Sequence, residues 1–242
     1  MIEIEKADML GHDNAALLTL STGKKYKILM RDYDDLDKSE LDLDELRFLS
    51  RKYSVYNAAL SKIAFSDMSK KQLYQKLYQK FAFPSGTAKE SQPAAISQMP
   101  REELRELCAA VCDEFEAAGY INDEKYALEK AEYLRESKKY GPGRIKEYLY
   151  QKGAAKSAID AAIAGVFADD DEDGDADGNG AGKNENINAE NMQALLSRKF
   201  RAGIDKTDRK DVAKAINYLS RNGYSYAQAK TAVTKFTEED DE

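Results

Sequence analysis

Histidine, the side chain most often used for acid–base chemistry, occurs once in this chain. Because His12 is the single imidazole, a serine–histidine–aspartate triad would have to be built on that residue. It stands between Gly11 and Asp13, and this neighbourhood is typical of a solvated loop position. We therefore expect no catalytic role for His12.

The two cysteines are four residues apart in a helical pattern. This spacing places Cys108 and Cys112 on one helix face together with Leu104 and Val111. A structural zinc site takes four ligands, and the sequence contains no second pair of Cys or His to complete one. We interpret both thiols as small buried apolar groups in a reducing compartment.

Motifs that bind phosphate or calcium are absent or incomplete. The chain has neither a Walker A motif nor the glycine fingerprint of dinucleotide-binding proteins. Asp173, Asp175 and Asp177 match the opening of an EF-hand loop, but Asn184 stands at the position that requires a bidentate glutamate. The sequence thus predicts no cofactor, no metal site and no enzyme activity.

Charge is distributed unevenly along the chain, whose formal net charge is −7. Residues 169–190 carry nine acidic side chains and one basic one, and residues 238–242 are all acidic. Residues 191–237 carry ten basic and three acidic side chains, so this part of the chain is strongly basic. A basic body with acidic appendages indicates contact with a polyanion or with an acidic protein. An ordinary solvated helical surface is the alternative.

Nothing in the sequence indicates a membrane-spanning segment. No apolar run approaches the roughly 18–20 residues that a membrane helix needs. The first residues, MIEIEKADMLGHDN, lack the basic start and the apolar stretch of a signal peptide. We expect a cytoplasmic protein.

The period of the hydrophobic pattern changes once along the chain. Apolar and polar residues alternate over residues 15–31 around a Ser-Thr-Gly-Lys turn, which predicts a β-hairpin. From Asp42 onward the pattern has the period of an α-helix. We expect a mainly α protein with a small N-terminal β-hairpin, in which three tandem three-helix repeats form an elongated curved array.

Shifts in composition divide the chain into segments, because Pro, Ser and Gly mark loops and acidic runs without apolar residues mark disorder. The expected segments are an N-terminal segment with the hairpin (1–41), helical repeat 1 (42–82), a linker loop (83–100), helical repeat 2 with an extra short helix (101–168), an acidic disordered insert (169–188), helical repeat 3 (189–237) and an acidic tail (238–242).

Three stretches align without gaps and suggest the repeat: 68–77, 140–149 and 224–233. In each, a small residue at the start of a helix is followed four and eight residues later by an apolar one, and an alanine stands ten residues before it. The small residues are Ser69, Gly141 and Ser225, the apolar ones Leu73, Ile145, Ala229, Leu77, Leu149 and Val233, and the alanines Ala59, Ala131 and Ala215. Chance similarity of amphipathic helices is the alternative explanation.

The same stretches resemble a known family. YLRESKKYGPGRIKEYLYQKG (133–153) resembles the middle repeat of the RecX regulatory proteins, and GYINDEKYALEKAEYL (119–134) the stretch that leads into it. Residues 216–233 are similar to the C-terminal repeat of that family and residues 61–77 to its first repeat. LDLDELRFL (41–49), with the hairpin, is similar to the N-terminal part of the longer members. The resemblance covers nearly the whole chain except the linker loop and the acidic insert.

The resemblance implies a regulator without catalytic activity. RecX proteins bind the RecA recombinase and its filament on single-stranded DNA, typically restraining recombination, ATP turnover and the coprotease function behind the SOS response. We accordingly expect RecA and the RecA–single-stranded DNA filament as partners, only weak direct contact with DNA, and a monomeric chain. A nucleic-acid-binding repeat protein that acts without RecA and a helical adaptor for an unrelated protein are the alternatives.

Basic side chains near the repeat turns are the candidate contacts with a partner or with DNA, because lysine and arginine bind phosphate. These candidates are Lys70, Lys71, Lys138, Lys139, Arg144, Lys146, Arg198, Lys199, Arg201 and Arg221. Tyr140, Tyr224 and Tyr226 stand beside the same turns, where they would stack on bases or pack against protein. For each of these residues, a solvated helix face or a packed ring is the alternative.

Overall fold

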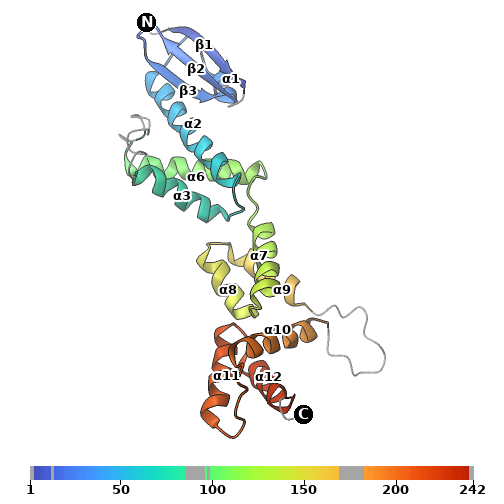
Figure 1. Ribbon diagram of the computed structural model, residues 1–242. Helices are drawn as coiled ribbons and strands as arrows, with labels where there is room; N and C mark the ends of the chain where they lie inside the picture. Colours follow the sequence, from blue (N-terminus) through green and yellow to red (C-terminus); the bar gives the residue numbers. More distant parts are fainter. Residues whose placement is uncertain (1–2, 12–13, 85–95, 97–98, 169–182, 240–242) are drawn as a thin grey trace. The chain divides into compact units, whose positions relative to one another are not determined.

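The computed structural model describes residues 3–11, 14–84, 96, 99–168 and 183–239. Within these ranges the chain forms ten helices and one three-stranded sheet, so the expected mainly α class is confirmed (Figure 1). None of the helices in the described ranges combines the length and the apolar character needed to cross a membrane. The chain divides into two compact units, Met1–Ile121 and Asn122–Glu242.

The first unit begins with an antiparallel sheet in the strand order β1–β2–β3. Its strands are β1 (Ile4–Leu10), β2 (Ala15–Leu20) and β3 (Lys25–Leu29). Strands β2 and β3 form the expected hairpin, in which Leu18 lies opposite Tyr26 and Gly23 takes a φ of +77° in the turn. The hairpin is therefore part of a larger sheet.

Strand β1 and helix α1 (Met30–Asp35) are not predicted by the sequence. Strand β1 pairs with β2 along its length, but its register shifts between Ile4 and Lys6. This irregularity disturbs the alternation of apolar and polar residues by which a half-buried strand is recognised. Met30, which the alternation assigned to the hairpin, instead begins helix α1.

Helix α2 (Leu43–Ile63) packs against strand β3 and closes the core of the sheet. The side chain of Asp42 caps the helix by accepting a hydrogen bond from the Asp44 N–H (2.9 Å). The buried residues of this core come from the sheet, from the turn after α1 and from α2, and are Ala16, Leu18, Leu20, Tyr26, Ile28, Leu36 and Leu46. The sequence shows two short apolar stripes after Asp42, and both belong to one continuous helix of 21 residues; the stripes are Leu43, Leu46 and Leu49, and Val55, Ala59 and Ile63.

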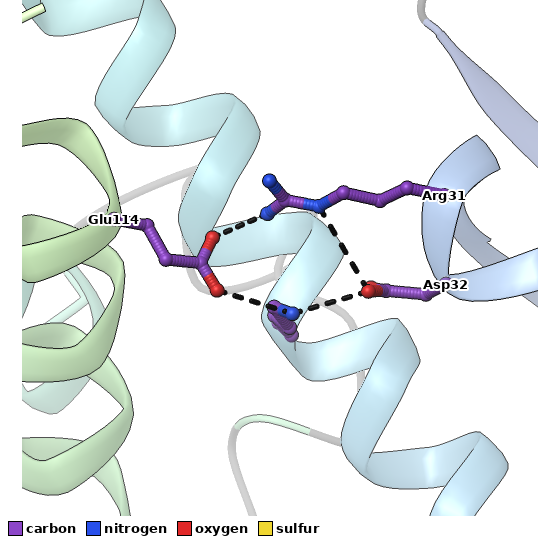
Figure 2. A network of polar contacts seen from close by, with 4 residues as sticks. Arg31, Asp32 and Glu114 are labelled. Carbon is purple, nitrogen blue, oxygen red and sulfur yellow. Dashed lines mark hydrogen bonds and ion pairs between the residues drawn. The ribbon is translucent and has the colours of Figure 1, made fainter. Parts of the chain in front are cut away.

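A network of four charged side chains joins α1, α2 and α6 (Arg101–Ala117) (Figure 2). The Lys52 Nζ lies 3.1 Å from an oxygen of Asp32 and 3.1 Å from an oxygen of Glu114. Arg31 completes the ring by pairing with Glu114 and lying 3.9 Å from Asp32. Because Arg31 and Asp32 follow directly after the sheet, the network fixes the sheet to the helices of the first unit.

Helices α2, α3 (Lys70–Ala82) and α6 form the first helix group. Ser69 begins α3 with a capping box, in which its hydroxyl accepts from the Gln72 N–H (3.2 Å) and the Gln72 side chain accepts from the Ser69 N–H (3.3 Å). Leu77 of α3 and Phe115 of α6 are fully buried in the shared core. Packing against α2 and α6 therefore buries the apolar face of α3.

The packing of α6 differs from the grouping suggested by composition. The sequence separates residues 101–117 from α3, because the Pro- and Ser-containing stretch at 83–100 looks like a linker. In the structure this stretch connects the second and third helices of one group. Residues 85–95 and 97–98 lie outside the described residues, whereas Ile96 and Met99 are buried in the core of the first helix group.

The second unit contains two further three-helix groups. The second helix group consists of α7 (Asp123–Lys138), α8 (Pro142–Gln151) and α9 (Lys156–Phe167), and the third of α10 (Lys183–Lys199), α11 (Arg209–Arg221) and α12 (Tyr226–Glu239). Each group encloses its own apolar cluster, so the unit has two separate hydrophobic cores. Figure 1 shows the three helices of each group side by side.

The repeated alanines Ala59, Ala131 and Ala215 are all fully buried, as expected for positions where helices approach closely. However, α12 is the third helix of its group, whereas α3 and α8 are second helices. The counterpart of α12 is α9, because Gly153 and Gly223 make equivalent turns before them, with φ values of +77° and +97°. The helix expected as an extra one therefore completes the second helix group.

The acidic segments lie largely outside the described residues, which do not include 169–182 or 240–242. Helix α10 begins at Lys183, so positions 183–188 of the expected disordered insert are helical. This start is tied to the second helix group, because Arg135 Nη2 donates to the Asn188 side chain (3.3 Å). A contact of this kind is not visible in the composition.

Candidate partner-binding surface

The structure assembles no site for metal or thiol chemistry in the ranges that it describes. No group of three or more His, Cys, Asp or Glu side chains is placed there to hold a metal ion. His12 and the EF-hand-like residues 173–177 lie outside the described residues. Burial raises the pKa of Cys108 and of Cys112 to about 12, so both thiols stay protonated near neutral pH and are poor nucleophiles.

Of the two candidates in the first unit, Lys70 is engaged within the protein. Its Nζ lies 2.6 Å from an oxygen of Asp113 and 2.6 Å from an oxygen of Glu116, both on α6. Hydrogen bonds to Asp113 and Glu116 raise the pKa of Lys70 above its usual value. Lys70 therefore joins α3 to α6, whereas the adjacent Lys71 is exposed.

The candidates on α8 have partners within the second helix group. Arg144 forms an ion pair with Glu147 one turn later (2.6 Å), and Lys146 pairs with Asp160 of α9 (3.1 Å). All four side chains are about half exposed, so water screens both pairs. The positive charge on this face is thus largely balanced by neighbouring carboxylates.

The candidates of the third helix group lie on its surface. Arg198 and Lys199 end α10, and Arg201 lies in the turn that follows. All three are exposed, and no carboxylate lies within 4 Å of them in the described part of the chain. Arg221, at the end of α11, is exposed as well. This group presents positive charge that its own acidic residues do not balance.

Two turns of the second unit meet directly and form what we call the turn junction (residues 139–143 and 222–224). The Gly141 N–H donates to the Asn222 carbonyl (2.8 Å), and the Gly143 N–H donates to the Gly223 carbonyl (3.0 Å). A Cβ atom at Gly141 would lie 2.7 Å from the Gly223 carbonyl carbon and oxygen. Only glycine allows the two backbones to approach so closely.

Tyr224 closes the turn junction on one side. Its ring is buried, with 4% of the residue exposed, and its hydroxyl donates to the Lys139 carbonyl (2.9 Å). Burial raises the pKa of Tyr224 above its usual value. Lys139 has a φ of +61° at the end of α7, and this turn presents its carbonyl to the tyrosine. The candidate Lys138 stands beside it and is exposed.

A buried arginine on α7 forms the other polar connection between the second and third helix groups. Arg135 is 6% exposed and donates to the Val166 carbonyl of α9, while its guanidinium lies over the Phe167 ring at 4.6 Å. The Asn191 side chain of α10 donates to the Arg135 carbonyl (3.3 Å). The sequence reasoning missed Arg135, although a charged residue next to the apolar Leu134 was a usable signal.

The structure brings two of the ten candidates together at the turn junction. Arg144 and Arg221 face an open depression of about 600 Å³. The depression is lined by Gly143, Arg144, Glu147, Ser220, Arg221, Gly223 and Tyr224. Its two guanidinium groups and its exposed backbone make it suited to polar contacts with another macromolecule. Lys70 and Lys71 belong to the other unit.

Comparison with protein families locates one domain within this architecture. Residues 122–163 match the family model of the second three-helix domain of RecX. This span covers α7, α8 and most of α9, the three helices that pack around one core. The chain carries a RecX domain. The resemblance of the middle stretch of the sequence to RecX is thereby confirmed.

Solved RecX structures share the fold of the chain. A crystal structure of regulatory protein RecX matches it with a TM-score of 0.65 at 19% identity, over 99% of this chain and 100% of that one. RecX from Lactobacillus salivarius matches with a TM-score of 0.50 at 18% identity, over 76% of this chain and 96% of that one. No curated protein sequence matches the chain. The RecX fold thus extends well beyond the RecX domain.

Proposed function

We propose that this RecX-type chain is a non-enzymatic regulator that binds the RecA recombinase, or its filament on single-stranded DNA, and restrains its activities. The observation that carries the proposal is the RecX domain at residues 122–163 within a chain whose fold matches a RecX structure over 99% of its length.

The structure supports a physical means of action that requires no catalysis. A binder changes the state of a filament when it has different affinities for two filament states, or when it covers a surface that a substrate needs. The turn junction fixes the third helix group against the second by backbone hydrogen bonds of 2.8 and 3.0 Å. Basic side chains on both groups are therefore presented by one compact unit, as an extended interface requires.

The single-stranded-DNA-dependent ATPase of a RecA from the same source, titrated with the full chain at fixed salt, tests the proposal. We expect ATP hydrolysis to fall at chain concentrations below that of the RecA monomer, because one bound chain affects several filament subunits. An unchanged ATPase rate at equal concentrations would reject RecA as the partner.

A pair of variants tests whether the third helix group contributes to the effect. Replacing Arg198 and Lys199 with alanine removes two exposed charges at the end of α10, and we expect the half-inhibitory concentration to rise. Replacing Lys24 and Lys25 removes two exposed charges in the hairpin and serves as the matched control. Equal shifts for the two double variants would show that only net charge matters.

One observation favours a second candidate function, binding of nucleic acid without RecA. Residues 191–237 carry ten basic and three acidic side chains, an imbalance typical of proteins that bind polyanions. Binding of an oligonucleotide by the chain alone distinguishes this function from the first, since the first requires RecA to be present.

A further inference from the structure

A groove on the third helix group is lined by none of the ten candidate residues. Its lining residues are Lys206, Arg209, Val212, Ala213, Ile216, Asn217 and Tyr226. The groove has a volume of about 290 Å³. This is close to the lower end of small-ligand sites, which measure roughly 300–1,000 Å³. The groove thus has room for a group the size of a single nucleotide rather than for a folded domain.

Tyr226 is the aromatic residue in the lining of the groove, and the helix that it begins is capped by its neighbours. It is the first residue of α12, and 67% of it is exposed. The Ser225 hydroxyl accepts from the Gln228 N–H (3.3 Å), and the Gln228 side chain accepts from the Ser225 N–H (3.1 Å). This capping box fixes the start of the helix that carries the exposed ring.

The basic edge of the groove comes from Lys206 and Arg209. Both side chains are exposed. Arg209 begins α11, and within the described ranges no carboxylate lies within 4 Å of its guanidinium. The Arg209 guanidinium is suited to a phosphate, which arginine binds through paired hydrogen bonds.

The acidic residues close to this edge are engaged elsewhere. Asp205 accepts hydrogen bonds from the N–H and the hydroxyl of Thr207 (2.8 and 2.7 Å), and these bonds lower the pKa of its carboxyl group. Asp208 caps α11 by accepting from the Lys210 N–H (2.8 Å). Asp211 is paired with a lysine one turn later in α11 (2.7 Å). These carboxylates shape the loop and the helix, and they leave the charge of Arg209 unbalanced.

The floor and the far side of the groove suit a nucleobase. Ile216 is buried and Val212 is half-buried, which gives an apolar floor. Asn217 is exposed at the side, and its amide group offers both a hydrogen-bond donor and an acceptor. An apolar floor, an aromatic wall and one amide group are what an unstacked base needs for stacking and for edge recognition.

We propose that this groove binds one nucleotide of a single-stranded nucleic acid, with the base against Tyr226 and the phosphate at Arg209. Charge complementarity supports this occupant, since the surrounding residues 191–237 carry ten basic and three acidic side chains. A single strand is required because the face of a base is available to an aromatic ring only when the base is not stacked within a duplex. The proposal rests on the second candidate function, binding of nucleic acid without RecA, and assigns a site to it; its test requires no RecA.

The second helix group does not repeat the lining of this groove at the equivalent positions. Gly153 and Gly223 align the two groups, and in this alignment the position of Tyr226 is taken by Lys156 and that of Ile216 by Lys146. Lys146 is paired with Asp160 (3.1 Å). The apolar floor and the aromatic wall therefore belong to the third helix group, and the second group serves as an internal reference.

Fluorescence anisotropy of a labelled oligothymidine, titrated with the full chain without RecA, tests the proposal. Replacing Tyr226 with alanine removes the stacking surface, and we expect affinity to fall about ten-fold. Tyr226→Phe keeps the ring and is expected to bind almost as the unaltered chain does. Tyr150→Ala removes a tyrosine that is 75% exposed on α8, and is expected to leave affinity unchanged. Circular dichroism verifies that each variant is folded.

A second pair of variants tests the phosphate contact. Arg209→Ala is expected to weaken binding and to make its dependence on salt shallower, because one phosphate contact fewer releases fewer counterions. Lys156→Ala removes the same charge at a position outside the groove and is expected to change the affinity and the salt slope much less. Equal losses for Arg209→Ala and Lys156→Ala would show that binding follows net charge and would overturn the assignment.

Two further outcomes contradict the proposal. One is equal affinity of the Tyr226→Ala and Tyr150→Ala variants for oligothymidine, which would show that no base stacks on Tyr226. The other is binding of polyglutamate as tightly as oligothymidine, with the same loss on Tyr226→Ala, which would identify an acidic protein as the occupant. An effect of the chain on the RecA ATPase is independent of both outcomes, so the two proposals fail separately.

Discussion

The second and third helix groups share one internal plan and differ on their surfaces. Ile145 and Leu149 of α8 are fully buried, and so are Ala215 and Leu219 at the equivalent positions of α11. A glycine with positive φ follows each of these helices. The buried positions are thus the part of the repeat that the architecture requires, because a three-helix core is formed from one apolar face of each helix.

The two groups differ in whether the basic side chains on their surfaces are paired with carboxylates. In the second group, Arg144 and Lys146 are paired with carboxylates of the same group. In the third group, Arg198, Lys199 and Arg201 have no carboxylate within 4 Å in the described part of the chain. The same three-helix core thus carries largely paired basic side chains in the second group and unpaired ones at the end of α10 in the third group.

Truncation of the equivalent core leucines has the largest expected effect and tests the shared plan. Both Leu149 and Leu219 are fully buried. We expect Leu149→Ala and Leu219→Ala each to cost about 2–5 kcal/mol of local stability, through lost burial and a cavity. Hydrogen exchange measured by mass spectrometry reports the second and third groups separately.

The location of the loss decides whether the two cores are independent. Separate cores predict that Leu149→Ala raises exchange mainly in α7–α9 and Leu219→Ala mainly in α10–α12. Equal acceleration in both groups for either variant would show that the two groups unfold as one body.

The turn junction joins the two groups, and its glycine provides the next largest effect. A Cβ at Gly223 would lie 2.2 Å from the Arg144 nitrogen, and the residue has a φ of +97°. We expect Gly223→Ala to cost about 2–4 kcal/mol, because backbone strain and displacement of the other turn add. Gly119→Ala is the matched control, since Gly119 has a φ of +74° and nothing within 4 Å of its Cβ position. It is expected to cost only about 1 kcal/mol.

The difference between the two glycine variants isolates the contact between the groups. Hydrogen exchange of the N–H groups of residues 141 and 143, which donate across the turn junction, is expected to accelerate in Gly223→Ala and not in Gly119→Ala. Unchanged exchange at both amides would mean that the junction rearranges around the added methyl group at little cost.

The features predicted from the sequence are those encoded by neighbouring residues. The small residues Ser69 and Gly141 at the starts of helices and the apolar positions Ile145 and Leu149 of α8 are all local signals, and the structure contains each of them. The helical period from Asp42 onward also indicated that the rest of the chain is built from helices. Local chemistry was therefore enough for the class of the fold and for most helix positions.

The features that the sequence did not provide depend on contacts between distant residues. The turn junction pairs residues about eighty positions apart, and the sequence of one turn does not indicate which other turn it contacts. Helix α6 packs with α2 and α3 across a loop whose composition resembles a linker. Lys70 looked available because its two carboxylate partners are more than forty residues away in the sequence. The grooves and the balance of charge on each group follow from such contacts.

Removal of the Tyr224 hydroxyl has a smaller expected effect. Tyr224→Phe deletes the hydrogen bond to the Lys139 carbonyl (2.9 Å), and we expect a loss of about 1 kcal/mol near neutral pH. Burial raises the pKa of Tyr224 in the folded chain, so folding favours the protonated phenol. The stability contributed by this group is complete below the unfolded pKa of about 10 and is lost as the pH rises above it.

The alkaline limb of the stability profile tests this sign. Urea unfolding of the second unit, followed by hydrogen exchange or circular dichroism, is expected to weaken less steeply above pH about 10 in Tyr224→Phe than in the unaltered chain. Tyr150→Phe changes an exposed tyrosine of α8 and is the control, with no expected change in the profile. Parallel alkaline slopes for all three chains would contradict the role of the buried phenol.

The smallest effect on stability concerns the ion pair that makes the second group differ from the third. Lys146 and Asp160 are 3.1 Å apart, and both side chains are about half exposed. Screening by water limits such a pair to roughly 0–1 kcal/mol, so Asp160→Asn is expected to change the stability of α7–α9 by less than about 0.5 kcal/mol. The same change releases the charge of Lys146 on a surface that otherwise balances it.

Asp160→Asn therefore makes the second group more like the third in charge without changing its core. We expect oligothymidine binding at low salt to strengthen by less than about three-fold, with a steeper salt dependence, because one more cation is available to phosphate. Lys146→Ala is the control and is expected to show no such gain, since it removes the charge instead of releasing it. A gain as large as the loss caused by Tyr226→Ala would mean that charge alone, and not the aromatic groove, separates the two groups in nucleic-acid binding.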